Sequence, residues 1–250
     1  MTGYQPIVIP FNYPGIKLSI NIRMFNTEAH INEQYKNQTL LWHRGDSEEK
    51  FGYNKLDKRI QWCLTEHINY KFNSYGFRSD EFTNIDNLVS LGCSFTLGTG
   101  IPYESTWSYI ISKKLNLANF NLAIDSTSAD CCFRMAYNWI SQLKPKIVLY
   151  QSPDPSRLEW FDGESRKPHN MSASSHNHSN FYKEWIVDEK NLKFNHLKNL
   201  HAIQHLAESA GAKFVHLSLS NIARLDYARD AGHYGPNTNR AVAENILRSL

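Results

Sequence analysis

The chain has 250 residues, of which 41% are hydrophobic and 13% aromatic, and its 27 Lys and Arg against 24 Asp and Glu give a formal net charge of +3. The aromatic content excludes an intrinsically disordered chain, and the dispersed basic residues argue against a nucleic-acid-binding surface. The length is that of one α/β domain with additions, or of two small domains.

The cysteines and the first residues favour a cytoplasmic protein. The cysteines, Cys63, Cys93, Cys131 and Cys132, form neither a disulfide framework nor a zinc-binding spacing. Reduced thiols are therefore expected. Residues 1–15 contain prolines and lack a basic n-region, so we expect no signal peptide. No apolar run reaches the roughly 18 residues of a membrane span.

Residues 1–70 are interpreted as an N-terminal extension packed on the main domain. The apolar run at 7–9 and the alternating segment at 16–22 predict a small β-rich appendage with turns. Segments 41–46 and 68–78 are typical of strands and turns, and the extension carries no recognisable chemistry.

From residue 87 to the end, strand patterns alternate with helical patterns, which places the main domain at 71–250. Short apolar runs predict strands at 88–91, 120–124, 146–151 and 213–219. Amphipathic spacing predicts helices at 104–115, 129–143, 194–210 and 236–250. This alternation implies a parallel sheet with right-handed crossovers.

One polar stretch, residues 164–182, interrupts the alternation and predicts a long loop. It contains His169, His176 and His178, which suggest a metal site. The alternative is a solvated polar loop, favoured because no carboxylate or cysteine accompanies these histidines at ligand spacing. We therefore expect no metal.

Ser94 is the first candidate for a nucleophile. It follows an apolar run that ends at Gly92, and in α/β folds such a position lies at the carboxyl edge of the sheet, where ligands bind. The alternative is a plain strand-to-loop turn in which Ser94 caps backbone groups. The stretch is not the G-x-S-x-G motif, because Thr96 stands at the second glycine position.

Asp230 and His233, just before the last predicted helix, are candidates for an acid–base pair. Their spacing puts both side chains on one side of a turn. A carboxylate beside an imidazole fixes its tautomer, and the other ring nitrogen can take a proton from a hydroxyl. Alone, a D-x-x-H pairing can arise by chance, whereas with a strand-end serine it completes a triad.

Residues 121–130 supply a third candidate element. They end at the same expected sheet edge, where backbone N–H groups can hold a developing oxyanion. The other interpretation is a Ser-rich helix cap, and both can hold at once.

Together these stretches resemble the motifs of the SGNH/GDSL hydrolases. Residues 92–96 followed by Gly98 are similar to block I, with cysteine where the name-giving motif has aspartate. Residues 230–233 resemble the terminal D-x-x-H block, and residues 121–130 with Arg134 resemble block II.

A further segment, residues 73–78, resembles one that precedes the nucleophile strand in some GDSL-like proteins, including phage-encoded ones. The resemblance covers about residues 70–250, and its blocks stand in the family's order. It implies a flavodoxin-like three-layer α/β/α sandwich and ester hydrolysis through an acyl-enzyme, with no cofactor. It assigns Ser94 as nucleophile, His233 as base and Asp230 as the residue that orients the base. The backbone N–H of Ser94 would be one oxyanion donor.

The chain departs from the family at two oxyanion positions. Ser126 stands where block II has glycine, and its N–H can still donate. Residues 150–154 replace the G-x-N-D of block III, so the asparagine donor is missing or Ser152 or Gln151 substitutes for it. Losing one donor slows catalysis without abolishing it.

Arg157 and Glu159 follow these positions, as in some divergent members. We interpret them as a structural ion pair, because such pairs are common.

The resemblance predicts a serine esterase acting on carbohydrate O-acetyl or small-acyl esters, with an acetylated glycan as the candidate substrate. One alternative is a weak or inactive glycan-binding or virion protein, associated with the particle if the chain is phage-encoded. Another is an O-acyltransferase using the same triad. The sequence leaves the oligomeric state open.

Overall fold

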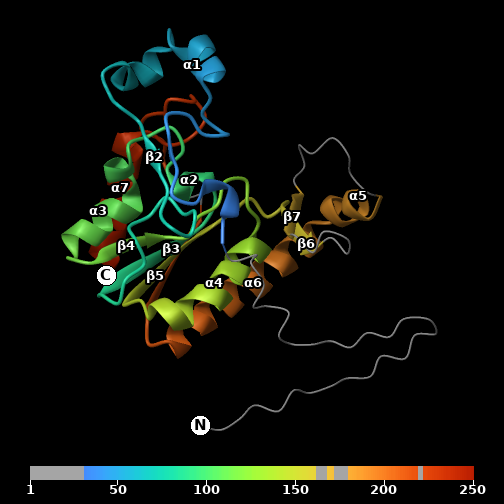
Figure 1. The fold of residues 1–250 in the computed structure, drawn as a ribbon. Coiled ribbons are helices and arrows are strands. Elements are labelled where there is room, and N and C mark those ends of the chain that lie inside the picture. The colour runs from blue at the N-terminus through green and yellow to red at the C-terminus, as the bar shows by residue number, and fades with distance from the viewer. Residues whose placement is uncertain (1–30, 162–167, 172–179, 219–221) are drawn as a thin grey trace, which may run out of the picture.

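The computed structural model describes residues 31–161, 168–171, 180–218 and 222–250 (Figure 1). The strands expected at 7–9 and 16–22, and the side chains of His176 and His178, lie outside the described residues.

A four-stranded parallel sheet forms the centre of the molecule, in the order β4-β3-β5-β8. Its strands are β3 (Asn87–Leu91), β4 (Ala118–Asn121), β5 (Ile147–Ser152) and β8 (Lys213–Ser218). Val89 lies opposite Phe120 on one side and Val148 on the other, and Val148 lies opposite Phe214. β3 and β5 are buried throughout, as expected for parallel strands covered on both faces.

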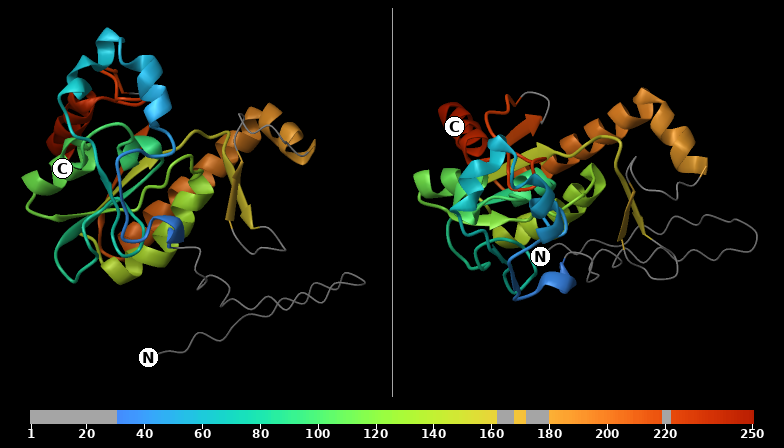
Figure 2. Two further views of the ribbon diagram at one scale, coloured as in Figure 1. Left: turned by 45° about the horizontal axis from the view of Figure 1, so that its top comes forward. Right: turned by 90° about the horizontal axis from the view of Figure 1, so that it is seen from above.

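Helices cover both faces of the sheet and make a three-layer α/β/α sandwich, as predicted (Figure 2). One layer is α4 (Ala129–Leu143) with α6 (Glu189–Ser209), and the other is α3 (Trp107–Lys114) with α7 (Pro236–Ser249). Each layer has its own apolar core. Trp139 and Ile203 belong to the core under α4 and α6, whereas Trp107 and Val242 belong to the core under α3 and α7.

The described part of the N-terminal region lies over the carboxyl end of the sheet (Figure 1). It consists of η3 (Glu33–Tyr35), β1 (Thr39–Leu40), α1 (Glu48–Asn54), η4 (Lys58–Leu64) and β2 (Tyr70–Lys71). The strands β1 and β2 pair in antiparallel fashion. Ile60, Tyr70 and Phe72 form a small core of their own.

Two predicted helices differ from the structure at their first turns. The expected helix at 104–115 is a short 3-10 turn, η5 (Tyr103–Ser105), followed by α3, whose N-cap Thr106 accepts a bond from the Tyr109 amide. The helix expected from residue 194 begins at Glu189, because Asp188 caps it by accepting a bond from the Lys190 amide.

The long loop expected over 164–182 is wrong for the described residues of that stretch. β6 (Leu158–Phe161) and β7 (Pro168–Met171) form an antiparallel pair, in which the Trp160 ring stacks on His169 at 5.8 Å between centroids. The helix α5 (Asn180–Val187) begins inside the same stretch. Cross-strand ring stacking stabilises a hairpin even where the sequence is polar.

The outer edge of β4 is occupied by the chain that precedes β3. The Asn119 carbonyl accepts bonds from the Asp80 amide at 3.2 Å and from Ser79 Oγ at 3.0 Å. In return, Asp80 Oδ2 accepts from the Asn119 amide, and Ser79 Oγ accepts from the Asn121 amide.

None of the helices in the described ranges combines the length and the apolar character needed to cross a lipid bilayer.

Candidate active site

Ser94 lies at the carboxyl end of β3, in a tight strand-to-helix turn. The strand ends at Leu91, and Ser94 is the first residue of α2 (Ser94–Leu97), with Cys93 as its extended N-cap. A Cβ atom on Gly92 would lie 2.1 Å from Thr96 Oγ1, so a side chain there would displace the turn. Ser94 is therefore held close to the end of the strand, and only 4% of it is exposed.

Asp230 and His233 lie together in the loop that precedes α7. A β-bridge between Tyr227 and Tyr234 closes this loop. Asp230 Oδ1 accepts bonds from the amides of Gly232 at 3.1 Å and His233 at 3.0 Å. The Asp230 carboxylate thus organises its own loop and fixes the position of the histidine.

A continuous hydrogen-bond chain joins the three side chains. His233 Nδ1 lies 2.6 Å from Asp230 Oδ2, and His233 Nε2 lies 2.7 Å from Ser94 Oγ. An ionised carboxylate only accepts hydrogen bonds, so Nδ1 carries the proton. In the neutral ring Nε2 is then an acceptor, and the Ser94 hydroxyl donates to it. The structure therefore brings the side chains of Ser94, His233 and Asp230 together in one hydrogen-bonded chain.

The environment of Asp230 favours its charged form. Burial alone would raise the pKa of the Asp230 carboxyl, but the bonds from the His233 ring, its charge and two backbone amides together lower that pKa below its ordinary value. The Phe95 ring packs 4.6 Å from the His233 ring, centroid to centroid, and limits its rotation.

Ser126 lies in the loop that follows β4, and its side chain is exposed. Its φ of 57° is in the left-handed region, which favours glycine. The backbone at Ser126 thus has a conformation that glycine adopts more easily than serine does. The Ser126 hydroxyl donates to Asp125 Oδ1 at 3.3 Å.

Gln151 and Ser152 lie at the end of β5, and the side-chain oxygen of each has a hydrogen-bond partner other than Ser94. Gln151 is fully buried, and its Oε1 accepts a bond of 2.7 Å from Thr96 Oγ1. Gln151 Nε2 has no hydrogen-bond partner among the described residues, so a substrate-binding role for Gln151 stays a prediction. Ser152 Oγ lies 2.6 Å from Nε2 of His216.

Glu159 does not pair with Arg157, so the ion pair expected between them is wrong. Glu159 instead receives two bonds of 2.8 Å from the Arg134 guanidinium, and both side chains are buried. Arg157 Nη1 donates to the Thr127 carbonyl at 3.2 Å.

A buried ion pair, which the sequence did not predict, lies beside the loop of Asp230 and His233, called here the acid–base loop. Arg229 Nη2 lies 2.6 Å from Asp46 Oδ2, and the Asp46 side chain is fully buried. Tyr70 donates to the same carboxylate oxygen at 2.6 Å and accepts from the Gly100 amide at 2.7 Å. The Arg229 amide in turn donates to the Gly100 carbonyl. This network links the N-terminal region, the loop after α2 that contains Gly100, and Arg229, the residue before Asp230.

Two further bonds reach the same loop from the N-terminal region. Asn54 Nδ2 donates to the Asp230 carbonyl at 3.1 Å, and Trp62 Nε1 donates to the Tyr227 carbonyl at 2.8 Å. The only sequence signal for these contacts was the position of Arg229 directly before Asp230. Nothing local pairs Arg229 with Asp46, which lies 183 residues away.

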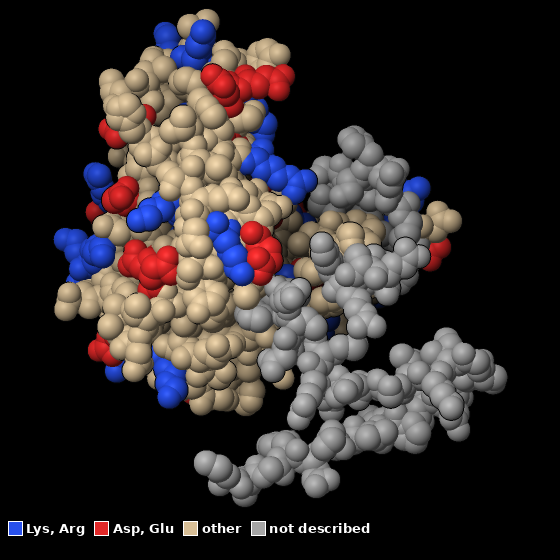
Figure 3. Space-filling view, viewed as in Figure 1, with Lys and Arg blue, Asp and Glu red and all other residues tan. Residues whose placement is uncertain are grey.

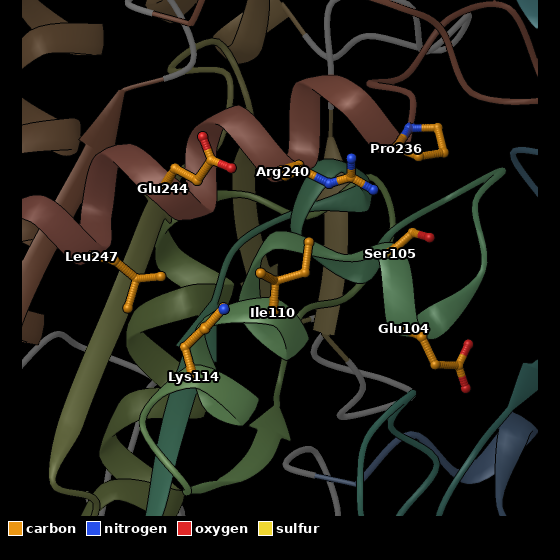
Figure 4. A pocket seen from close by; sticks show the side chains of 8 residues that line it. All are labelled: Glu104, Ser105, Ile110, Lys114, Pro236, Arg240, Glu244 and Leu247. Carbon is orange, nitrogen blue, oxygen red and sulfur yellow. The ribbon is translucent and has the colours of Figure 1, made fainter.

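A cavity of about 330 Å³ lies between α3 and α7 (Figure 4). Its lining residues are Glu104, Ser105, Ile110, Lys114, Pro236, Arg240, Glu244 and Leu247. None of them is a candidate site residue, so we do not assign the cavity to the chemistry of Ser94.

Charges of both signs are interspersed on the face shown in Figure 3. This face presents no continuous basic surface.

No protein-family model and no curated protein sequence matches this chain. Solved structures similar to it include esterases and lipolytic proteins of the GDSL type, at low identity. TesA is 13% identical over 66% of this chain and 98% of its own, with a TM-score of 0.43.

Two others are enzymes from bacteria. The acetyl xylan esterase Est2A from the rumen bacterium Butyrivibrio proteoclasticus is 12% identical over 66% of this chain and 63% of its own, with a TM-score of 0.35. A GDSL-like lipase from Bacteroides thetaiotaomicron is 11% identical over 66% of this chain and 86% of its own, with a TM-score of 0.31.

Proposed function

We propose that this chain is a serine esterase that hydrolyses ester bonds through an acyl-enzyme at Ser94. One observation carries the proposal: a hydrogen-bond chain runs from Ser94 Oγ through the His233 ring to Asp230, with distances of 2.7 and 2.6 Å. The bond between His233 and the Asp230 carboxylate is short and charge-assisted, and it holds the base ready to take the hydroxyl proton.

In the first half-reaction Ser94 Oγ forms a bond to the ester carbonyl carbon while its proton passes to His233 Nε2. The π electrons of the carbonyl move onto its oxygen. When the tetrahedral intermediate collapses, the bond to the alcohol oxygen breaks and that oxygen takes the proton from His233. Asp230 remains ionised and stabilises the imidazolium.

In the second half-reaction water repeats these steps on the acyl-enzyme. His233 takes a proton from water as its oxygen attacks the acyl carbon. The proton then returns to Ser94 Oγ as the acyl–serine bond breaks and the carboxylic acid leaves.

For the substrate we propose carbohydrate O-acetyl or other small-acyl esters. Analogy with the SGNH hydrolases that the sequence resembles supports this class, together with the aromatic content of 13%, since aromatic rings can stack on sugar rings. A glycan acceptor in place of water would turn the same acyl-enzyme into an O-acyltransferase, and product analysis with and without an acceptor separates the two.

The test is an esterase screen on p-nitrophenyl acetate and acetylated sugars with wild type and Ser94→Ala. We expect Ser94→Ala to abolish hydrolysis, because nothing else supplies the attacking oxygen. The matched control is Ser90→Ala, which changes a fully buried serine on β3, the strand that precedes Ser94, and should keep activity. Equal hydrolysis by wild type and Ser94→Ala would refute the proposal.

A second candidate is a catalytically weak SGNH-fold protein that binds glycans or serves in a virion. The observation that favours it is that Ser152 Oγ is already bonded to His216, and that the side-chain amide of Gln151, although unpartnered among the described residues, is fully buried. Stoichiometric labelling of Ser94 by a fluorophosphonate would count against it.

A further inference from the structure

Arg157 is directed back towards the sheet edge by a tight turn after β5. Asp154 Oδ1 accepts bonds from the amide and the hydroxyl of Ser156, at 2.8 and 2.6 Å, so the carboxylate is turned towards its own loop. The Asp154 carbonyl accepts the Arg157 amide at 3.1 Å and closes the turn.

The Arg157 guanidinium lies between the two loops that carry Ser94 and Ser126. Its Nη1 donates to the carbonyl of Thr127, the residue after Ser126, at 3.2 Å. It also lies against the thiol of Cys93, the residue before Ser94. Burial raises the pKa of Cys93, and the positive charge of Arg157 opposes that rise.

Within the described ranges, no carboxylate lies within ion-pair distance of Arg157, and the acidic groups near it have other partners. Glu159 is paired with Arg134 at 2.8 Å. Asp130 accepts bonds from the side-chain amides of Asn195 and Asn199. The charge of Arg157 is therefore not neutralised by a partner in this part of the molecule.

We infer that Arg157 stabilises the oxyanion that forms when Ser94 attacks an ester, an inference that rests on the proposed function. As the Ser94 oxygen bonds to the carbonyl carbon and its proton moves to His233, the carbonyl oxygen gains the negative charge. A guanidinium stays protonated throughout, and in a site that excludes water its charge acts more strongly than a neutral amide. Because Ser152 Oγ is already bonded to His216, Arg157 would add a charged donor at this edge of the sheet.

The test compares Arg157→Met and Arg157→Lys with wild type on p-nitrophenyl acetate, a neutral ester. We expect Arg157→Met to lower kcat by about 10²- to 10³-fold, the effect of losing one oxyanion donor, with little change in KM. Arg157→Lys keeps the charge but loses the planar guanidinium, so its kcat should lie between those of wild type and Arg157→Met. Arg248→Met removes the same charge from the exposed far end of α7 and should leave kcat unchanged.

Two measurements separate this role from a structural one. Guanidinium chloride at millimolar concentration should restore part of the activity of Arg157→Ala but not raise that of wild type. Phenylboronic acid, which forms a negatively charged tetrahedral adduct with a reactive serine, should inhibit Arg157→Met more weakly than wild type. Circular dichroism checks that the Arg157→Met and Arg157→Ala variants are folded.

Three outcomes would overturn this inference or the proposed function on which it rests. If Arg157→Met retains the wild-type kcat while Ser94→Ala is inactive, the proposed function stands and the role of Arg157 is wrong. If Arg157→Met raises KM only for esters with a carboxylate, Arg157 binds an anionic substrate group instead. If wild type and Ser94→Ala are equally active, the esterase proposal itself fails.

Discussion

Asp230 is the residue whose ionisation most directly connects pH to this site. Its folded pKa lies below the ordinary value, despite burial, because the His233 ring and two amides bond to the charged form. The ionised carboxylate therefore stabilises the folded chain at every pH above its unfolded pKa of about 3.9, and this contribution is lost as the pH falls through the lower folded value.

We expect Asp230→Asn to remove that contribution and to slow catalysis. In urea titrations at a series of pH values, the free energy of unfolding of wild type should fall more steeply below about pH 4 than that of the variant. An amide can donate to the imidazole and favour the wrong tautomer, so kcat should drop by about 10⁴-fold if Asp230 acts as proposed. An unchanged kcat would remove Asp230 from the triad.

The proximity of Ser94, His233 and Asp230 could be predicted from the sequence because each sits in a short motif with a turn or strand end beside it. Gln151 could not be placed in this way. In a strand, neighbouring side chains take opposite faces, and because both faces of β5 are buried, the neighbours of each side chain depend on how the helical layers pack. Gln151 shares the face of Leu149 and reaches Thr96 inside the molecule, whereas Ser152 shares the other face with Tyr150.

At the scale of elements, the N-terminal region and the acid–base loop are joined by the buried pair of Asp46 and Arg229. Replacing one partner of such a pair leaves a buried charge without compensation. We expect Asp46→Asn to lower the free energy of unfolding by about 3–5 kcal/mol, measured by urea titration. Because Arg229 directly precedes Asp230, kcat of the folded variant should fall as well.

The matched control is Asp86→Asn. Asp86 pairs with Lys146 at 3.4 Å on the surface, where both side chains are mostly exposed. Surface pairs contribute little to stability, so this variant should unfold like wild type. If Asp46→Asn behaves like Asp86→Asn, the buried network does not hold the loop.

Element boundaries were predictable where local signals agree. The structure has α4 at 129–143, as predicted, because Ser128 caps its first turn and Lys144 ends it in the left-handed conformation. The pairing of β6 and β7 was missed because both strands have only four residues and β7 lies in a polar stretch. This pairing depends on contacts across strands that no local period reveals.

At the scale of the whole molecule, contacts across the boundary at residue 70 predict that the described parts unfold together. The network around Tyr70 and the bond from Trp62 join η4 and β2 to the site loops. In hydrogen exchange at increasing urea, amides of 58–72 and of β3 should therefore converge on one unfolding free energy. A lower value for 58–72 would show that the extension opens by itself.

The layer architecture could be predicted because alternating strands and helices leave few topologies. The network that joins Asp46 to Arg229 could not, because it spans 183 residues and depends on how the N-terminal region crosses the sheet edge. Tertiary contacts of this kind have no signature in composition or periodicity.

The bonds from Ser79 and Asp80 to β4 have a consequence for crowded solutions. An open strand edge is a template on which a second molecule can add its own strand and begin to aggregate. Here the Asn119 and Asn121 amides and the Asn119 carbonyl are already occupied by the chain itself. An incoming strand would first have to displace that segment, so this side of the molecule resists intermolecular sheet growth.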